Sequence, residues 1–188
     1  MKTRLLMLTV AMSCAFAGNA MALTKDEYKT QKTSISTSYK ASRDKCDALK
    51  SNAKDICMSE AKGAEKVAKA ELEAQYKPSA KHTEAVALAK GDAAYDTAKE
   101  KCDDLSSNAK DVCIKDAKAA HVKVKEEAKV ARTAATTSNP DKVVAARKEA
   151  NSEEREASYK AAKERCDAMT GAGKDTCQND AKNKFGMK

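Results

Sequence analysis

The feature that most constrains this chain is a pair of cysteines separated by ten residues, which occurs three times. The clearest copy reads CDDLSSNAKDVC. The six cysteines of the three copies are Cys46 with Cys57, Cys102 with Cys113, and Cys166 with Cys177. Successive copies begin 56 and then 64 residues apart. Internal repeats of this length are typical of stacked helical hairpins, so the spacing predicts a repeated architecture.

The repeat extends beyond the cysteines. A tyrosine stands seven residues before each first cysteine, and a Lys-Asp dipeptide precedes each second cysteine by two residues. These positions are Tyr39, Tyr95 and Tyr159, then Lys54-Asp55, Lys110-Asp111 and Lys174-Asp175. Because the tyrosines recur at fixed positions, we expect them in the hairpin core or beside the cysteine pairs rather than in a ligand cage.

The N-terminus has the pattern of a secretory signal peptide. A short cationic start precedes an apolar run over residues 5–17, and Ala20 and Ala22 supply small residues before a cleavage site between Ala22 and Leu23. The apolar run is shorter than the roughly 20 residues that span a bilayer, which disfavours a membrane anchor. Cys14 is a poor match to a lipid-attachment site, so a lipoprotein is disfavoured. We expect a periplasmic or secreted protein.

Cleavage there would reduce seven cysteines to six, an even number in an oxidising compartment. This combination predicts a disulfide framework, and the three equal spacings favour pairing within each repeat. The alternative is a set of reduced cysteines packed in a helical core.

Two geometries are possible for each pair. In a continuous helix the two cysteines would be separated by a rise of about 16.5 Å, whereas a disulfide joins α-carbons about 4.4–6.8 Å apart. A turn at Ser51-Asn52 would instead place Cys46 and Cys57 on facing helices, with Asn52 as cap of the second helix. The glycines of Gly171-Ala-Gly173 favour the same turn in the third copy. The rival is a long helix whose cysteines bridge to another helix or chain.

Composition favours helices with a thin core. Leu, Ile, Val and Phe number 17 of the 166 residues that follow Ala22, and the net charge of that part is +6. Abundant Ala, Lys and Glu and only two prolines nevertheless favour helix, starting at Thr24 with Glu27 in a capping box. We therefore predict an all-α fold of three repeated helical hairpins, each closed by a disulfide, in an elongated or loosely bundled array with coiled-coil packing. The predicted units are a signal peptide over 1–22, hairpins over 23–78 and 79–135, a linker over 136–141 and a third hairpin over 142–188.

The motif Cys-Asp-x-Leu-x-x-Asn-Ala-Lys-Asp-(Ile/Val)-Cys resembles that of a family of uncharacterised secreted proteins of Gram-negative bacteria. These proteins are rich in Ala, Lys and Glu and are sometimes labelled TolA-like or cell-envelope proteins. The resemblance covers nearly the whole chain after residue 22, although the third copy lacks the Asn. It implies an envelope location and no established activity.

Little in the sequence suggests catalysis, and we predict a non-enzyme without cofactors. His82 and His121 are expected to be isolated surface histidines, because a zinc site needs several converging ligands. The cysteine spacing is not that of a redox motif. We expect a structural or binding role in the cell envelope, one form of which is stress-related. The alternatives are a chaperone-like binder of unfolded clients and Cu(I) or thiol-based metal sequestration. Anionic envelope surfaces or envelope proteins are the expected partners, with no nucleic acid and no transmembrane segment after residue 22.

Overall fold

The structure is a computed structural model that describes residues 23–188. The predicted signal peptide lies outside these residues, together with Cys14 and the Ala22 side of the predicted cleavage site. Leu23 and Thr24 lead directly into the first helix.

Six helices account for nearly all of the described chain, and this part contains no strand. They are α1 (Lys25–Cys46), α2 (Ser51–Tyr76), α3 (Ala80–Cys102), α4 (Ser107–Thr136), α5 (Pro140–Cys166) and α6 (Gly171–Phe185). The predicted all-α fold of three helical hairpins is confirmed. The helices form the pairs α1–α2, α3–α4 and α5–α6, each closed by a disulfide.

Local sequence explains where several helices begin. Thr24 and Glu27 form the predicted capping box, in which the Thr24 hydroxyl accepts from the Glu27 N–H and the Glu27 carboxylate accepts from the Thr24 N–H. Asn139 caps α5, whose first residue is Pro140. The linker predicted over 136–141 therefore reduces to three non-helical residues, 137–139, between α4 and α5.

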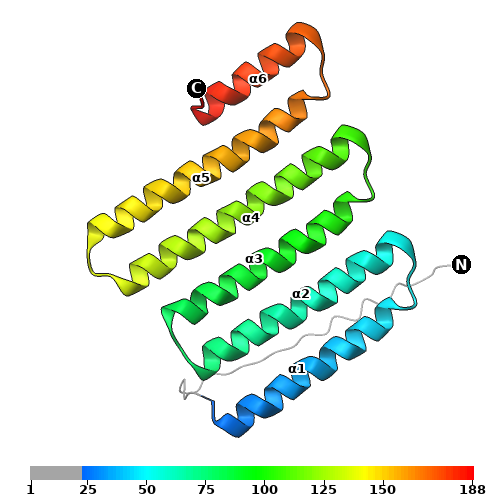
Figure 1. Ribbon diagram of the computed structural model, residues 1–188, viewed down its shortest axis with the longest axis vertical. Coiled ribbons are helices and arrows are strands. Elements are labelled where there is room, and N and C mark those ends of the chain that lie inside the picture. The colour runs from blue at the N-terminus through cyan, green and yellow to red at the C-terminus, as the bar shows by residue number, and fades with distance from the viewer. Residues whose placement is uncertain (1–22) are drawn as a thin grey trace, which may run out of the picture.

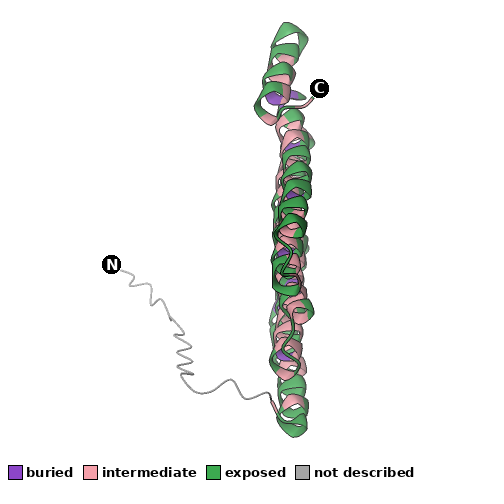
Figure 2. Ribbon diagram, turned by 90° about the vertical axis from the view of Figure 1, so that its left-hand side faces the viewer, coloured by how far each residue is buried: buried purple, intermediate pink, exposed green. Residues whose placement is uncertain are grey.

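The helices lie side by side in a single layer. Figure 1 shows them antiparallel and in chain order from α1 to α6, and the edge-on view in Figure 2 shows that the layer is one helix thick. Among the described residues, contacts between helices join only consecutive helices. The array is therefore the elongated form of the predicted architecture, in which each helix leaves two faces uncovered by its neighbours.

Small side chains fill the contacts between helices. The buried residues are mostly alanines and the first cysteine of each pair, and Leu72 is the one large aliphatic residue among them. Gly63 lies against Ala93, and Gly91 lies against Val124, so closely that an added Cβ would meet their side chains at 2.7 and 2.8 Å. The absence of a side chain at Gly91 thus allows α3 to approach α4.

The three hairpin turns share one backbone conformation. The residue five positions after each first cysteine, Ser51, Ser107 or Gly171, has φ between 51° and 58°. This left-handed conformation is unstrained only for glycine, so the third turn carries the residue that fits it best. Two details of our prediction were wrong. The chain reverses over residues 47–50, before Ser51-Asn52, because α1 already ends at Cys46, and Gly173 lies within the first turn of α6 rather than in the hairpin turn.

Candidate functional site

The three cysteine pairs form three disulfides, one in each hairpin. The bonds join Cys46 to Cys57, Cys102 to Cys113, and Cys166 to Cys177. The α-carbons are 5.5 or 5.6 Å apart, in the ordinary range for a disulfide. The first cysteine of each pair ends its helix and is fully buried, and the second lies two turns into the returning helix. The predicted closure of each hairpin by its own cysteine pair is confirmed.

An ion pair spans each turn beside the disulfide. The pairs are Lys54 with Asp47 at 2.9 Å, Lys110 with Asp103 at 2.9 Å, and Lys174 with Asp167 at 2.8 Å. The hydrogen bond from the lysine lowers the pKa of Asp47 and of Asp167 below the usual value. The lysine of each repeated Lys-Asp dipeptide therefore acts within its own turn, as does the aspartate that follows each first cysteine.

Asn52 and Asn108 connect one hairpin to the next. The Asn52 amide donates to the Glu100 carbonyl at 2.8 Å, and the Asn108 amide donates to the Glu164 carbonyl at 2.9 Å. Glu100 and Glu164 lie in the last turns of α3 and α5, where each carbonyl also accepts from the backbone N–H of the C-cap residue, Asp103 or Asp167, at 3.1 Å. The prediction that Asn52 caps its own helix was wrong, because Asn52 is the second residue of α2, and Lys50 is the N-cap.

Three helices meet at Asp92. The carboxylate of Asp92, on α3, accepts hydrogen bonds from Lys66 Nζ of α2 at 2.6 Å and from His121 Nε2 of α4 at 2.7 Å. The His121 ring also stacks on Tyr95. Burial opposes ionisation of Asp92, but the hydrogen bonds from Lys66 and His121 outweigh it and lower the pKa of Asp92.

The prediction that both histidines are isolated surface residues was wrong for His121. His121 has only 11% of its side chain exposed, so it is a contact between helices rather than an isolated surface residue. His82 lies in the first turn of α3, where its Nδ1 contacts the Lys77 carbonyl. Over residues 23–188 no group of three or more His, Cys, Asp or Glu side chains is arranged to hold a metal ion.

The tyrosines that make specific contacts join neighbouring helices. Tyr28 stacks on Tyr76 and donates to Glu73, which joins α1 to α2. Tyr95 stacks on His121 and so joins α3 to α4. Of the three repeat tyrosines, Tyr95 alone makes one of these stacking contacts within residues 23–188, and all three are half-buried rather than part of the buried core.

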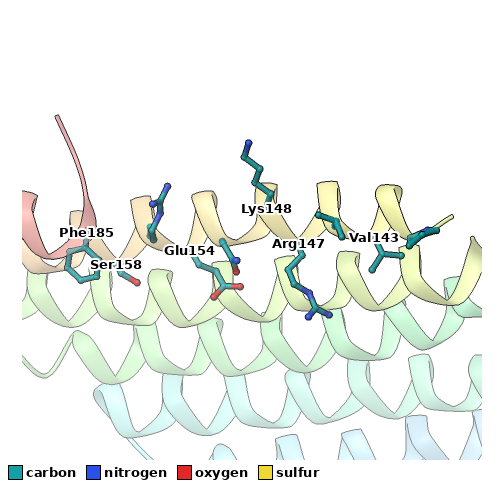
Figure 3. A pocket seen from close by; sticks show the side chains of 10 residues that line it. Val143, Arg147, Lys148, Glu154, Ser158 and Phe185 are labelled. Carbon is teal, nitrogen blue, oxygen red and sulfur yellow. The ribbon is translucent and has the colours of Figure 1, made fainter.

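An apolar groove runs along α5, at the edge of the layer. Its volume is about 1080 Å³, and its apolar lining includes Val143 and Val144 at one end and Phe185 at the other (Figure 3). Arg147, Lys148 and Arg155 also line it. Figure 3 shows Lys148 pointing away from α4, toward the open side of α5. We did not predict this groove from the sequence. The signal was that only 11 residues follow Cys177, too few for a helix as long as α2 or α4.

Comparison with known proteins finds no matching family model, no matching curated protein and no matching solved structure. None of the helices formed by residues 23–188 combines the length and apolar character needed to cross a bilayer.

Proposed function

We propose that this protein is a non-enzymatic scaffold of the cell envelope, which presents the faces and edges of a stapled helical layer to other molecules. The observation that supports this proposal is the single layer of three disulfide-closed hairpins. Such a layer exposes a large surface for its size, and repeat proteins use extended surfaces of this kind for binding.

Three disulfides suit an oxidising compartment, such as the periplasm or the cell exterior. A core built mainly from alanine buries little apolar area per residue, and small cores of this kind depend on covalent closure. The disulfides thus favour a location where thiols are oxidised, in agreement with the signal-peptide pattern of residues 1–22.

The geometry favours this role over the two alternatives. A chaperone-like binder needs a broad apolar surface, whereas the exposed large apolar residues of the described chain are Leu49, Leu105, Val144 and Met169. Cu(I) sequestration needs thiolates, but the six cysteines of the described chain are bonded in pairs.

The experiment that tests this proposal compares a strain that lacks the protein with strains that produce the full chain or the chain without residues 1–22. We expect loss of the protein to increase permeability of the envelope to large antibiotics and detergents. The full chain should restore the barrier, and the chain without residues 1–22 should not. Unchanged permeability under envelope stress, or equal rescue by both forms, would contradict an envelope role.

A further inference from the structure

The second helix of the third hairpin is much shorter than its counterparts. Helix α6 has 15 residues, whereas α2 has 26 and α4 has 30. It ends at Phe185, where Gly186 adopts the left-handed conformation of a helix C-cap. Compared with α2, 11 residues of helix are missing, which corresponds to about 16 Å of length at 1.5 Å per residue. The first half of α5 therefore has no neighbour on the side that α2 covers on α1 and α4 covers on α3.

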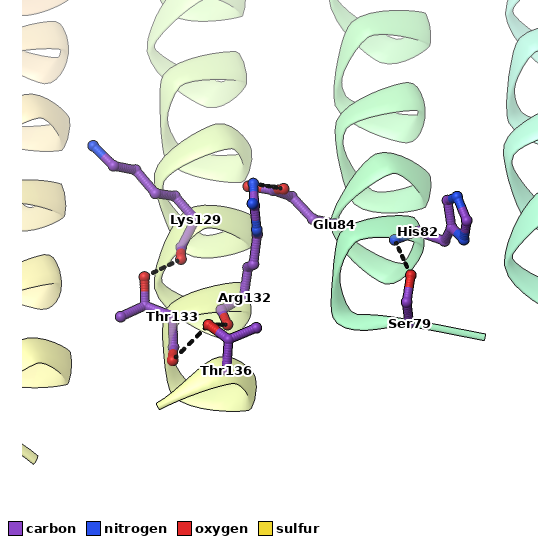
Figure 4. Close-up of polar contacts among 7 residues, drawn as sticks. All are labelled: Ser79, His82, Glu84, Lys129, Arg132, Thr133 and Thr136. Atoms are coloured by element: carbon purple, nitrogen blue, oxygen red, sulfur yellow. Dashed lines mark hydrogen bonds and ion pairs between the residues drawn. The ribbon is translucent and has the colours of Figure 1, made fainter. Parts of the chain in front are cut away.

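The repeat identifies which side of α5 is left open. The residue eighteen positions before each first cysteine is Tyr28, Glu84 or Lys148. Tyr28 donates to Glu73 of α2. Glu84 pairs with Arg132 of α4 at 2.8 Å, and this second contact is drawn in Figure 4. At this position the first helix of a hairpin contacts the far half of its second helix. Lys148 occupies the same position on α5 and lies beyond the end of α6.

A second repeat position leads to the same conclusion. Eleven residues before the first cysteine, Gly91 packs directly against Val124 of α4. The corresponding residue of α5 is Arg155, which lines the groove close to Gly186, at the end of α6. Val144, Lys148, Asn151 and Arg155 follow one another at intervals of four, three and four residues, which places them on one stripe of the helix.

The chemistry of this stripe indicates what would cover it. Val144 is 66% exposed and lies beside Val143 at one end of the groove, whereas Phe185 lies beside Ser158 at the other end (Figure 3). Around this apolar lining, Arg147, Lys148 and Arg155 form no ion pair within residues 23–188. In Figure 3 the one carboxylate of the groove, Glu154, and also Arg147 point toward the α4 side, whereas Lys148 points away from it. An apolar lining with unpaired cations at its margin is complementary to an amphipathic helix with acidic flanks.

We propose that the open side of α5 is a docking site for an acidic amphipathic helix of a partner protein, which completes the third hairpin as α2 completes the first. The partner's apolar residues lie on Val143, Val144 and Phe185, and its carboxylates pair with Arg147, Lys148 and Arg155. This inference deepens the binding role proposed above and depends on that role for its biological setting.

A second copy of this chain is a poorer occupant. The other edge of the layer is α1, which carries six Lys and Arg residues against three Asp and Glu residues. End-to-end stacking would bring this basic helix against the cations of α5, and contact between like charges opposes association.

The test uses the purified full chain with its disulfides intact and two synthetic amphipathic helical peptides. Both peptides have leucines at the same positions, and one has glutamates where the other has lysines on the flanks. We expect fluorescence anisotropy to show binding of the acidic peptide that is at least about tenfold tighter than binding of the basic one, given the energies of exposed ion pairs. NMR amide shifts on binding should concentrate at residues 143–155 and around Phe185.

Charge reversal at the groove supplies the decisive comparison. The variant with Arg147→Glu, Lys148→Glu and Arg155→Glu should lose about tenfold in affinity for the acidic peptide. The matched control carries Lys25→Glu, Lys32→Glu and Lys40→Glu on α1, which change net charge equally and make no ion pair in the described chain. It should bind like the original protein. Three results would overturn the inference. The first two are an equal loss of affinity in both variants and an equal affinity of the original protein for both peptides. The third is concentration-dependent self-association that Val144→Asp abolishes. Absence of peptide binding alongside the permeability defect would remove the docking site and leave the scaffold role standing.

Discussion

At the scale of single residues, Asn52 and Asn108 have the most informative position in this chain. Each belongs to one hairpin by sequence and bonds to a helix end of the next hairpin. In the third repeat Ala172 stands at the same position, and no described helix follows α6. Within the described chain, the amide is therefore present in the two hairpins that another hairpin follows and absent from the third.

Replacing Asn52 or Asn108 with alanine should lower the free energy of unfolding by about 1 kcal/mol, the usual net value of one hydrogen bond. The physical reason is that a carbonyl at the end of α3 or α5 loses its side-chain donor. The measurement is urea-induced unfolding followed by circular dichroism. As a control, Ala172→Asn should change stability by less than about 0.5 kcal/mol, because no helix of residues 23–188 follows α6 to offer a carbonyl. Equal effects at all three positions would show that the asparagine acts within its own turn.

Asn52 also shows which kind of contact could not be predicted from the sequence. Asn52 follows the turn as a helix cap would, and only the three-dimensional arrangement shows that its partner is Glu100, 48 residues away. The same limit applied to His121, whose partner Asp92 lies 29 residues away on another helix. The replacement of Asn by Ala172 was a visible signal of a contact between repeats.

At the scale of helices, local patterns were sufficient to predict the hairpins but not their arrangement in a layer. The cysteine spacing and the geometry of a disulfide required the chain to reverse between Cys46 and Cys57, and it does. Whether alanine-rich helices form a bundle or a layer depends on which of their faces meet, and composition gives little indication of that. Here Gly63 allows α2 to approach α3 and Gly91 allows α3 to approach α4, and within residues 23–188 only consecutive helices are in contact.

The close approach of α2 and α3 makes a prediction with an internal control. Gly63→Ala should destabilise the protein by about 1–3 kcal/mol, because its Cβ would lie 2.7 Å from the Ala93 side chain and 3.3 Å from the Ala93 backbone. Gly173→Ala in α6 should stabilise it by up to about 1 kcal/mol, because nothing lies within 4 Å of the added atom. Thermal unfolding of both variants provides the measurement. A stabilising Gly63→Ala would mean that the two helices are farther apart than described.

The contact of α2, α3 and α4 at Asp92 should respond to pH. The hydrogen bonds from Lys66 and His121 hold the pKa of Asp92 below the value of about 3.9 that Asp has in an unfolded chain. The stability from this group is therefore present above about pH 4 and is lost as the pH falls through the pKa of the folded state.

Urea midpoints measured between about pH 5 and pH 2.5 test this prediction, since the range brackets the titration of aspartate. Other carboxylates also titrate there, so the comparison is between the original protein and Asp92→Asn. The original protein should lose more stability than the variant over this range. Equal losses would mean that Asp92 contributes nothing to the pH dependence.

At the scale of the whole molecule, the layer behaves as a one-dimensional array. Contacts between helices join only consecutive helices, so stability is approximately a sum over hairpins and the interfaces between them. Each hairpin has a core made chiefly of alanine and a buried cysteine. A disulfide that closes so short a loop contributes roughly 3 kcal/mol on the chain-entropy model, which is large relative to such a core.

The central claim is that three local disulfides close the three hairpins, and mass spectrometry tests it most directly. The protein is produced from the full chain, isolated from the compartment to which it is exported, alkylated and digested without reduction, and its linked peptides are identified. We predict three linkages, Cys46 with Cys57, Cys102 with Cys113, and Cys166 with Cys177, and no alkylated cysteine among these six. Six alkylated cysteines, or linkages between different repeats, would contradict the account.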